Sequence, residues 1–596
     1  MSHYKSNLRD LEFNLFEFSR VQDYVGEGEW ASLDRDTMGD ILVEMERLAR
    51  EDYAASYEDQ DRIPLRLVDG EVRIPDSVKA SVRAFKEGGW DRLGIPEEMG
   101  GMPVPPSLAW AISEMLLAAN TTAQFYAGGN MFAGVLFEEG TEEQKEIAKL
   151  WVAKSWAGTM VLTEPDAGSD VGAGTTRAID QGDGTWHIEG VKRFITGGEH
   201  DIDENIMHLV LARPEGAGPG TKGLSLFLVP KYLIDEDGSL GSRNGVFATN
   251  IEKKMGLKGS TTCELTFGTD EPAIGYLVGG KHDGIRQMFR VIEFARMMIG
   301  TKAMGTLSTG YLNALEYAQE RHQGSDLAEA TDKSAPKVAI IDHPDVRRML
   351  MTQKAHVEGL RALVLYTAWV QDQAILHPDD GWERRSDLLL PLVKGYSSEK
   401  AYELLSSALQ VFGGSGYTQD YPMEQYIRDA RIDTIYEGTT GIQALDLFFR
   451  KIARDQGATL ARLAGEIVEF VKGGADSDPL AEERELLAQM LDDTQAHLGS
   501  MVEHLMGSVA GEKEEIYKVG LQTNHLLESM AETVIAWLML RHAEIALDKV
   551  DDDPFYRGKV ESARWFLRHV APKVGIRRAA ALAEDGSLMD VPVEAF

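Results

Sequence analysis

The sequence predicts an α+β protein in which helical and β-rich segments occupy separate blocks of the 596-residue chain. Apolar residues recur at three- and four-residue spacing in a first block and again in a long final block, as along one face of a helix. Between them lie short runs rich in β-branched and aromatic residues, separated by turn-rich segments. Because the strands are grouped together, the pattern argues against an alternating βαβ sheet and a Rossmann domain.

The first block predicts a helical domain with an N-terminal extension, residues 1–155. Helical periodicity covers residues 38–59, 77–90 and 107–138, and a glycine- and proline-rich stretch at 100–106 separates two of these helices. The length of the whole chain favours three or four such domains, because domains usually hold about 100 to 200 residues.

The second block, residues 156–283, predicts a β domain, either an antiparallel sandwich or a barrel. Its strands are expected at 157–163, 185–196, 206–213, 223–230 and 263–267. The Gly-Pro-Gly-Thr-Lys-Gly segment at 218–223 resembles a phosphate loop only weakly, because Gly223 follows the lysine and a strand comes next. We therefore interpret it as an ordinary loop.

The third block predicts a bundle of long helices, residues 284–455, followed by an extra helical domain, residues 456–596. Long amphipathic runs lie at 288–322, 343–376 and 387–414, with a polar insertion at 324–342. The final domain carries apolar helix faces at 480–511, 522–550 and 561–576 that need a partner surface. A solvated helix face is favoured over a membrane-binding one for its scattered basic residues, Arg564, Arg568, Lys573, Arg577 and Arg578.

Bulk composition excludes several functional classes. The chain has 61 basic and 96 acidic residues, a net charge of -35, so nucleic acid is not an expected partner. One cysteine, Cys263, leaves no intrachain disulfide and no multi-cysteine metal site, and we expect no metal. The amino terminus has no apolar signal core, and no apolar run reaches about 18 residues, so we expect a cytoplasmic protein without stable membrane insertion.

The segment from 407 to 443 interrupts the final helical block with polar and glycine residues. Gln410 leads into Gly413 and Gly414, where missing Cβ atoms allow close backbone approach to a bound group. Glu437 then lies between Tyr436 and Gly438, at the start of another helix. Taken alone, these residues are typical of a helix stop and a helix entry, so their meaning depends on the rest of the chain.

Four separated motifs in this order resemble the acyl-CoA dehydrogenase flavoprotein family over roughly residues 36–455. The first motif runs from Met160 through Leu162, Thr163, Gly168 and Ser169 to residue 170. The resemblance implies that the Met160 and Leu162 backbone and the Thr163 hydroxyl bind the flavin ring. It places Gly168 and Ser169 at the pyrophosphate and the CoA moiety.

The second and third motifs imply further contacts with flavin and substrate. Phe194 and Thr196 stand where the family has an aromatic wall and a hydroxyl near flavin N5, although Phe replaces the usual Trp and Gly197 the usual Asn. Glu293 and Arg296 match a substrate- and base-adjacent position. Arg321 would bond the flavin pyrophosphate of a neighbouring subunit, although the phenylalanine that usually follows its motif is missing here.

The fourth motif is the 407–443 segment. The resemblance implies that Gln410, Gly413 and Gly414 hold the adenylate end of FAD across a dimer interface, and that Glu437 is the catalytic base. Tyr436 and Gly438 flank the base at the substrate. Thr439 and Gly441 would complete the cofactor site at the start of a helix, with Gly441 in place of the more usual Gln.

The resemblance implies FAD-dependent α,β-dehydrogenation of acyl-CoA to trans-2-enoyl-CoA in fatty acid β-oxidation. Glu437 would remove the α proton while the β hydrogen passes as hydride to flavin. Its backbone N–H and a flavin ribityl hydroxyl would stabilise the enolate, and apolar surroundings would raise the pKa of Glu437. Electron-transferring flavoprotein is the expected acceptor, and a homodimer the expected assembly.

Four alternatives stay open. An acyl-CoA oxidase that uses oxygen shares these motifs. The C-terminal extension resembles both the very-long-chain and the 3-methylmercaptopropionyl-CoA dehydrogenase branches, and chain length cannot be deduced from the pattern. A flavin-free scaffold could retain the fold, although Glu437, Thr163 and Gln410 together argue against it. A membrane-surface protein would depend on the terminal helices alone.

Overall fold

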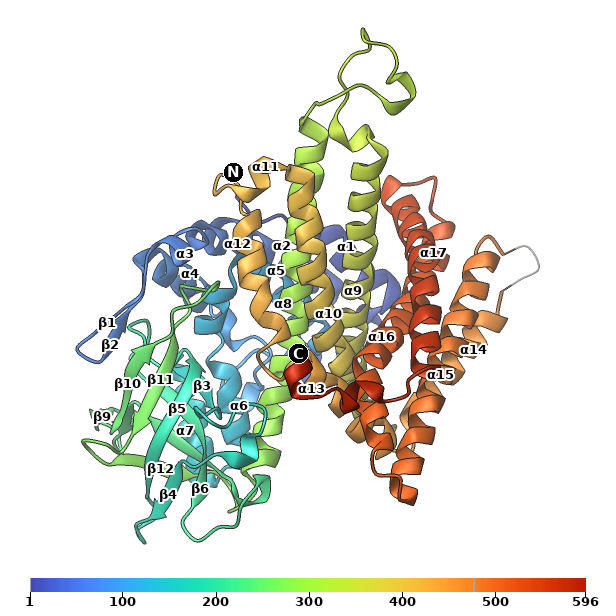
Figure 1. The fold of residues 1–596 in the computed structure, drawn as a ribbon. Helices are drawn as coiled ribbons and strands as arrows, with labels where there is room; N and C mark the ends of the chain where they lie inside the picture. Colours follow the sequence, from blue (N-terminus) through green and yellow to red (C-terminus); the bar gives the residue numbers. More distant parts are fainter. Residues whose placement is uncertain (1, 475–477) are drawn as a thin grey trace. The chain divides into compact units, whose positions relative to one another are not determined.

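The computed structural model describes residues 2–474 and 478–596, and these form two compact units (Figure 1). Unit 1 comprises residues 2–6 and Tyr24–Ala295, and unit 2 comprises Asn7–Asp23 and Arg296–Phe596. The division falls within helix α8 (Gly284–Glu320), whose first turns belong to unit 1 and whose remainder belongs to unit 2. The four domains expected from the sequence divide the chain more finely, and their boundaries stay a prediction.

Unit 1 contains the predicted N-terminal helical block. Helix α7 begins with a capping box, in which the Thr141 hydroxyl accepts from the Gln144 N–H and the Gln144 side chain accepts from the Thr141 N–H. The helices of this block are α2 (Arg35–Leu48), α3 (Asp59–Arg62), α4 (Asp76–Glu87), α5 (Pro106–Ala127), α6 (Asn130–Glu139) and α7 (Glu142–Lys154).

A small hairpin interrupts this helical block. Strands β1 (Arg66–Val68) and β2 (Glu71–Arg73) pair antiparallel around Asp69 and Gly70, which both have positive φ. Asp-Gly with two positive φ angles is the signature of a tight hairpin turn. These strands were not predicted, because three residues are too few to show the alternation of a strand.

The β domain of unit 1 is built on one eight-stranded sheet within the described residues, with strand order β10-β11-β5-β12-β7-β6-β3 and β4 beside β5 and β6. Most neighbours are antiparallel, as predicted, but β6 pairs parallel with both β3 and β4. The strands are β3 (Ala157–Val161), β4 (Arg177–Asp180), β5 (Trp186–Thr196), β6 (Ile206–Pro214), β7 (Ser225–Pro230), β10 (Val246–Ile251), β11 (Thr262–Phe267) and β12 (Ala273–Leu277). A separate pair is formed by β8 (Tyr232–Ile234) and β9 (Leu240–Arg243).

Central strands of this sheet are buried on both faces. On β6, Leu209 belongs to a core that includes Trp151 of α7, whereas the next residue, Val210, belongs to a second core with Phe267 of β11. Successive side chains of a strand point to opposite faces, so one apolar run fills two cores. This explains why the strand segments read as continuous apolar runs.

Unit 2 contains the predicted bundle of long helices. Helix α9 (Pro344–Leu376) packs along α10 (Trp382–Phe412), and α12 (Met423–Ala430) packs on α10 as well. Short helices α11 (Gly414–Tyr417) and α13 (Thr440–Leu445) flank α12 in the sequence, and a π-helical segment, η13 (Asp446–Ala453), continues α13. The predicted insertion at 324–342 holds two short 3-10 turns, η10 (Leu327–Glu329) and η11 (Ile340–Asp342), and Ala339 forms an isolated antiparallel bridge with His322.

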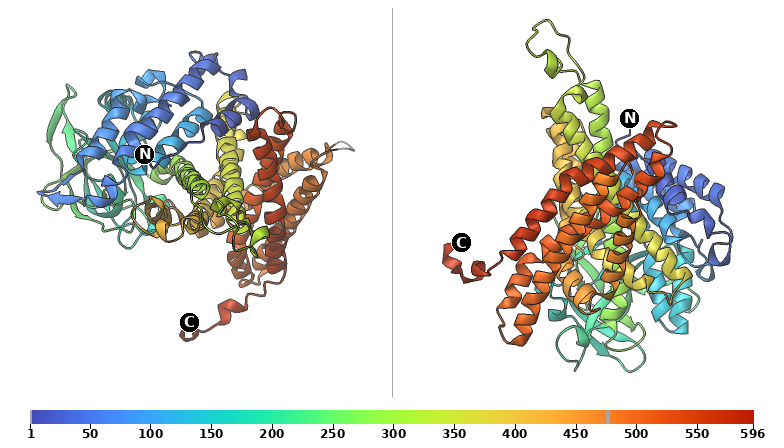
Figure 2. Two further views of the ribbon diagram at one scale, coloured as in Figure 1. Left: turned by 90° about the horizontal axis from the view of Figure 1, so that it is seen from above. Right: turned by 90° about the vertical axis from the view of Figure 1, so that its right-hand side faces the viewer.

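The C-terminal helices of unit 2 pack side by side and against the bundle. Helices α15 (Ala481–Ala510), α16 (Glu515–Leu547) and α17 (Pro554–Leu582) contact one another, and α16 and α17 also contact α9 (Figure 2). Helix α14 (Ala458–Lys472) precedes them. Several basic residues of α17 form ion pairs, for example Arg577 with Glu532 and Arg578 with Asp493. The prediction of a solvated face did not include these pairs, and the pair of Arg577 with Glu532 is largely buried.

An N-terminal segment of the chain belongs to unit 2. The carboxylate of Asp10, on α1 (Leu8–Glu12), is fully buried and accepts from Arg361 of α9 at 2.6 Å and from Lys559 of α17 at 2.7 Å. This segment therefore joins a bundle helix to a C-terminal helix through buried charge. Within the described ranges, no helix is long and apolar enough to cross a membrane.

Candidate active site

The first predicted flavin motif lies at the end of strand β3. Met160 belongs to the strand, Leu162 and Thr163 follow it half-buried, and Gly168 and Ser169 are exposed beyond a turn. The carbonyl oxygen of Thr163 accepts from the Arg193 N–H at 2.9 Å, so this motif lies beside the residue that precedes Phe194. The structure thus brings the first two predicted motifs together.

A buried ion pair that the sequence did not reveal fixes this strand end. Lys192 Nζ lies 2.9 Å from Glu164 Oε1 and donates to the Leu162 carbonyl at 2.8 Å. Glu164 also accepts from the backbone N–H groups of Thr175 and Thr176. Burial alone would raise the pKa of Glu164, but Lys192 and these donors outweigh it and lower the pKa to about 2.

Phe194 has an unusual backbone for a non-glycine residue. Its φ is +62°, in the left-handed region, and 54 % of its surface is exposed although the ring is large and apolar. Such strain costs about 1–2 kcal/mol and concentrates at functional positions. Gly197 has a φ of +68°, a conformation that glycine adopts readily, and Thr196 is exposed at the strand end.

Glu437 is half-buried in unit 2 and also has a left-handed backbone, with φ +56°. Burial raises the pKa of Glu437 to about 7, and the positive charges of Lys394 and Arg296 oppose part of that shift. A carboxylate with a pKa near neutrality can accept a proton in the physiological range. The side chain therefore has the electrostatic properties of a general base.

Charged residues hold the segment that precedes Glu437. Tyr436 donates its hydroxyl to Asp433 at 2.9 Å, and Lys302 of α8 contacts both oxygens of the same carboxylate at 2.6 and 2.7 Å. Asp433 and Lys302 are fully buried. Tyr436 is thus anchored by its hydroxyl, which the sequence could not show.

The segment that follows Glu437 is held from two helices. The Gln443 side chain of α13 donates to the carbonyl of Glu437 at 2.9 Å and to that of Gly438 at 3.2 Å. Lys394 of α10 donates to the Gly438 carbonyl at 2.6 Å. Gly438 has φ +86°, and a Cβ there would lie 2.8 Å from the Gln443 amide nitrogen. Sequence reasoning missed Lys394, whose only signal is a lysine within an apolar helical run.

Arg296 lies on α8 and is buried. Its guanidinium donates to Asp446 at 2.6 Å, and Asp446 begins the π-helical segment after α13. Its positive charge lowers the pKa of Glu437, which agrees with a base-adjacent position. Glu293 is half-buried and belongs to unit 1.

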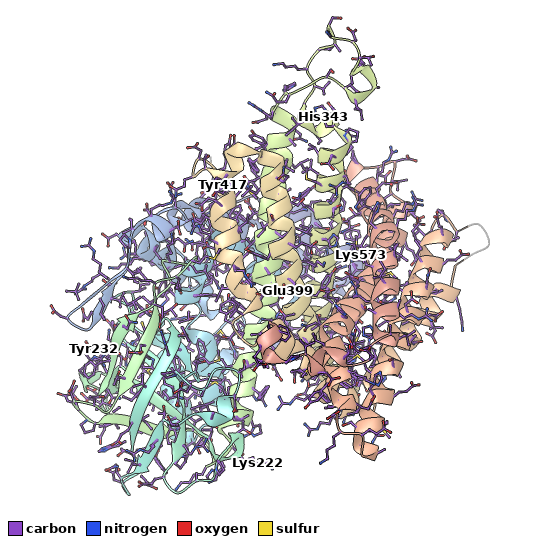
Figure 3. The ribbon with its side chains drawn as sticks, in the orientation of Figure 1. Lys222, Tyr232, His343, Glu399, Tyr417 and Lys573 are labelled. Atoms are coloured by element: carbon purple, nitrogen blue, oxygen red, sulfur yellow. The ribbon has the colours of Figure 1, made fainter. Side chains whose placement is uncertain are left out.

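Thr439 and its neighbours shape the start of α13. The Thr439 hydroxyl accepts from the Ile442 N–H at 3.3 Å and caps the helix, while Thr440 donates to Glu399 of α10 at 2.6 Å. Glu399 is labelled in Figure 3. A Cβ on Gly441 would meet nothing closer than 3.9 Å. The Thr439 hydroxyl thus has a structural partner in addition to its predicted cofactor role.

The residues predicted for the adenylate end lie where α8 and α10 end. Arg321, Gln410, Gly413 and Gly414 are all exposed, and Gly413 has φ +60°. The ring of Tyr317, one turn before Arg321, packs on the Phe412 ring with a centroid distance of 4.5 Å, and its hydroxyl lies 3.5 Å from Ser415 Oγ. The two helix ends are therefore in contact, and an aromatic cluster of Tyr317, Phe412 and Tyr421 links them.

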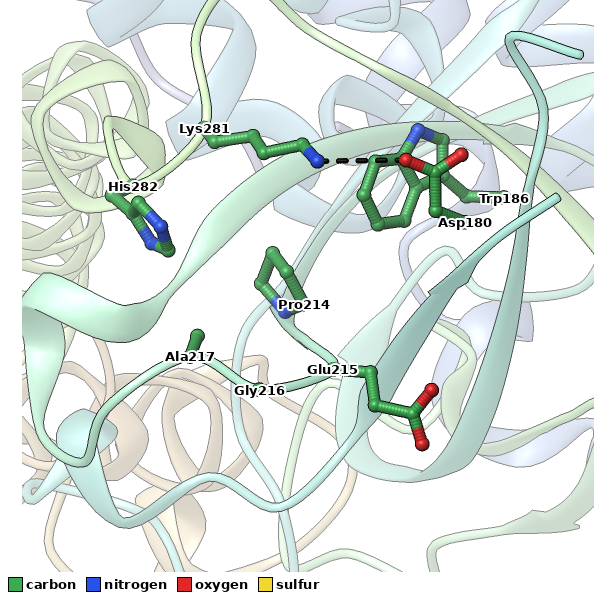
Figure 4. A pocket seen from close by; sticks show the side chains of 8 residues that line it. All are labelled: Asp180, Trp186, Pro214, Glu215, Gly216, Ala217, Lys281 and His282. Atoms are coloured by element: carbon green, nitrogen blue, oxygen red, sulfur yellow. Dashed lines mark hydrogen bonds and ion pairs between the residues drawn. The ribbon is translucent and has the colours of Figure 1, made fainter. Parts of the chain in front are cut away.

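A surface pocket of about 420 Å³ lies elsewhere on unit 1 (Figure 4). It is lined by Trp186 at the first residue of β5, whereas Phe194 and Thr196 lie at the other end of this strand. Lys281 contacts Asp180 at 3.5 Å and the Trp186 ring at 4.6 Å. None of the predicted site residues lines this pocket.

Comparison with known proteins assigns the chain. Family models match it in order: "Acyl-CoA dehydrogenase, N-terminal domain" at 46–150, "middle domain" at 159–269, "C-terminal domain" at 282–450, and "Acetyl-CoA dehydrogenase C-terminal like" at 463–592. The broad-specificity linear acyl-CoA dehydrogenase FadE5 of Mycobacterium tuberculosis is 53% identical over 100% of both chains. The chain belongs to the acyl-CoA dehydrogenase family.

Other known proteins match most of its length, in sequence or in fold. The 3-methylmercaptopropionyl-CoA dehydrogenase of Ruegeria pomeroyi is 35% identical over 95% of this chain and 96% of its own. An acyl-CoA dehydrogenase from Bacillus anthracis, complexed with FAD, matches with TM-score 0.73 and 20% identity over 93% of this chain and 89% of its own. Caenorhabditis elegans ACDH-11 in complex with C11-CoA matches with TM-score 0.71 and 19% identity over 99% and 95%. The predicted fold class and enzyme family are confirmed, and the roles of single residues stay predictions.

Proposed function

We propose that this chain is an FAD-dependent dehydrogenase of linear acyl-CoA thioesters, with Glu437 as the base that removes the α proton. The observation that carries the proposal is the environment of Glu437. Its carboxylate is half-buried, its pKa is raised to about 7 by burial, and both adjoining peptide carbonyls are held in place. A base of this pKa is half ionised near neutral pH.

The residues predicted for the cofactor fit FAD. Phe194 has a strained backbone and presents an exposed aromatic ring, and Gly168, Gly413 and Gly414 have open space where a Cβ would lie. Met160, Leu162, Thr163, Phe194 and Thr196 would hold the ring system. When bound, FAD supplies the acceptor for the β hydrogen, which it takes as hydride.

The remaining predicted residues would hold the phosphates, the adenylate end and the substrate. Gly168, Ser169, Thr439 and Gly441 would lie near phosphate or CoA. Arg321, Gln410, Gly413 and Gly414 would serve the adenylate end, from the second subunit of a homodimer. Glu293, Arg296, Tyr436 and Gly438 would line the acyl site, with Arg296 acting on Glu437 through its charge.

Glu437 would take the α proton of the thioester, and its own backbone N–H would stabilise the enolate oxygen that forms. Removal of one such donor costs about 3 kcal/mol in known oxyanion sites. Tyr436, anchored to Asp433, would close one side of the base and limit access of water. The product is the trans-2-enoyl-CoA, which places the reaction in fatty acid β-oxidation.

Substrate breadth is proposed from the relatives. FadE5, named as a broad-specificity linear acyl-CoA dehydrogenase, is 53% identical over the full length, so we favour broad use of linear chains. The Ruegeria relative supports 3-methylmercaptopropionyl-CoA as a narrower alternative. We propose electron-transferring flavoprotein as acceptor, a cytoplasmic location, and the four domains 1–155, 156–283, 284–455 and 456–596.

A panel of acyl-CoAs tests the proposal. Anaerobic addition of C4 to C16 linear thioesters and 3-methylmercaptopropionyl-CoA to the flavin-loaded protein should bleach its absorbance with several linear chains. Reoxidation should be fast with electron-transferring flavoprotein and slow with oxygen. Bleaching by the methylthio substrate alone would favour the narrower enzyme, rapid turnover with oxygen would favour an oxidase, and a protein that cannot be loaded with FAD would favour a scaffold.

A further inference from the structure

Glu437 and Gly438 form two successive residues with positive φ, +56° and +86°. Glycine adopts this conformation freely, but glutamate does so only when its surroundings impose it. The cap of α13 at Thr439 fixes the chain after these residues, and the anchored Tyr436 fixes it before them. Between these two anchors, the orientation of the Glu437 and Gly438 carbonyl groups still has to be fixed by other contacts.

Lys394 fixes the orientation of the Gly438 carbonyl by a hydrogen bond. It lies on α10, 44 positions before Gly438 in the sequence, and its Nζ donates to the Gly438 carbonyl at 2.6 Å. Gln443 donates to the same oxygen and to the Glu437 carbonyl. Two fully buried side chains, one on α10 and one on α13, thus hold the Glu437 and Gly438 carbonyl groups by hydrogen bonds.

A buried lysine is an unusual donor to a backbone carbonyl, because a neutral side chain could donate the same hydrogen bond. An ammonium has three donors, and among the described residues its hydrogen-bond acceptor is one backbone carbonyl. Burying a charge is costly unless other charges compensate it. The negative groups that act on Lys394 are Asp433, Glu437 and Glu399, while Arg296 opposes them.

The other charged groups near this segment have partners of their own. Lys302 of α8 pairs with Asp433, and Arg296 of α8 pairs with Asp446 of η13. Glu399 of α10 accepts from Thr440. On α16, which packs against α10 and α13, Glu532 pairs with Arg577, as Glu528 also does. Within the described part of the chain, Lys394 thus acts on Glu437 by its charge while its own hydrogen bond goes to a backbone carbonyl and not to a carboxylate.

We propose that Lys394 is a positioning residue for the base. Its hydrogen bond to Gly438 holds Glu437 in the left-handed conformation, and its ammonium charge favours the ionised carboxylate. This inference rests on the proposed function of Glu437 and adds to it a residue that the motifs do not contain. Lys394 would thus act on Glu437 in two ways, through the hydrogen bond that sets the backbone geometry and through its charge. Different substitutions can remove these two effects separately.

Three variants of the flavin-loaded enzyme make this separation. K394M removes the donor and the charge, K394R keeps the charge, and Gln443→Met removes a donor to the same carbonyls without a change of charge. K400M is the matched control, because Lys400 lies on the same helix and pairs with Glu403. The readout is the pH profile of flavin reduction by the linear acyl-CoA that reduces the wild type fastest, with flavin content measured in parallel.

In K394M the acid limb of the profile should shift to a pH about one unit higher. At pH values below the limb this shift lowers the rate of flavin reduction about tenfold. K394R and K400M should keep the wild-type limb. Gln443→Met should lower the maximal rate and leave the limb in place. Burial lowers the pKa of Lys394 to about 8, so the effect of its charge should fade above that pH. A lower maximal rate of K394M that persists there, as in Gln443→Met, would measure the loss of the hydrogen bond.

An unfolding cycle tests the inference without turnover. At pH 7.5, K394M should lower the Tm more in the wild-type background than in the E437Q background, because only the former holds the carboxylate. Equal Tm losses, or a K394M limb identical to wild type, would overturn the inference. If K394M does not load flavin, K394Q replaces it, because its amide keeps a donor and lacks the charge. A wild type that no acyl-CoA reduces would instead refute the proposed function, and the unfolding cycle would still decide the role of Lys394.

Discussion

Lys394 Nζ donates a 2.6 Å hydrogen bond to the carbonyl oxygen of Gly438, the residue that follows Glu437. A helix of the bundle thereby holds the peptide next to the proposed base. The same segment is anchored by Tyr436 on Asp433 and capped by Thr439. The position of one carboxylate is therefore set by contacts that come from separate parts of unit 2.

The pH dependence of catalysis follows from the raised pKa of Glu437. Because burial raises this pKa to about 7 and the base acts in its ionised form, kcat/KM should rise with pH and level off above about 7. Below the limb, each pH unit should lower kcat/KM about tenfold. Stopped-flow reduction between pH 5.5 and 9 measures this, and a rate that stays constant down to pH 5.5 would show that the carboxylate is solvated during catalysis.

Removing the buried carboxylate of Glu164 should destabilise unit 1. E164Q leaves Lys192 buried without its counter-charge, and we expect a loss of about 3 kcal/mol in the free energy of unfolding. E189Q is the matched control, because Glu189 pairs with Arg177 at an exposed position and should cost under about 1 kcal/mol. Urea unfolding at pH 7 compares the two variants, and equal losses would contradict the prediction.

The same pair predicts a dependence of stability on pH. Since Glu164 has a folded pKa near 2, below its unfolded value of about 4.5, its contribution is present above pH 4.5 and is lost as the pH falls toward 2. The stability difference between wild type and E164Q should therefore shrink over that range. A difference that stays constant down to pH 2.5 would show that ionisation of Glu164 does not matter.

Substitutions at Phe194 should separate backbone strain from ring contact. F194G relieves a φ of +62° and F194A does not, so the flavin-free F194G protein should be more stable than F194A by about 1 kcal/mol. Both variants lose the exposed ring and should bind FAD about tenfold more weakly, whereas F194W should retain affinity. Thermal unfolding and flavin fluorescence titration give the two values, and wild-type affinity in F194A would exclude a flavin contact.

The N-terminal segment should depend on Asp10 for its attachment to unit 2. D10N removes the carboxylate that Arg361 and Lys559 share at this buried position, and we expect a loss of about 3 kcal/mol in the free energy of unfolding. D23N is the control: it removes an exposed ion pair with Arg20 in the same segment and should hardly change the free energy of unfolding. Limited proteolysis should cut D10N near residues 7–23 sooner than D23N, and equal rates would argue against the buried anchor.

The fold was largely predictable because its signals are periodic. Helix α9 and strand β6 each carry an apolar pattern long enough to recognise, and the grouping of strands indicated the β domain. The parallel pairing of β6 with β3 and β4 was not predictable, because strand direction depends on connections between distant segments. The hairpin at Asp69 was not predicted, because each of its strands has only three residues.

The site was predictable only where its residues form motifs. Glu437 and Phe194 were found through a family resemblance, but their left-handed backbones follow from surrounding contacts. Lys192, Lys394 and Asp10 were missed because their partners lie 28, 44 and more than 350 positions away. No local pattern encodes such a pairing, since a charged residue in an apolar run has no sequence signal for its partner.

The most direct test of the central claim is an anaerobic titration of flavin-loaded wild type and E437Q with the same linear acyl-CoA. Glutamine keeps the size of the side chain and cannot accept the α proton. The account predicts that the wild type is bleached within seconds and that E437Q, with equal flavin content, reacts at least about 100-fold more slowly. Bleaching of E437Q at the wild-type rate would contradict the assignment of Glu437 as the base.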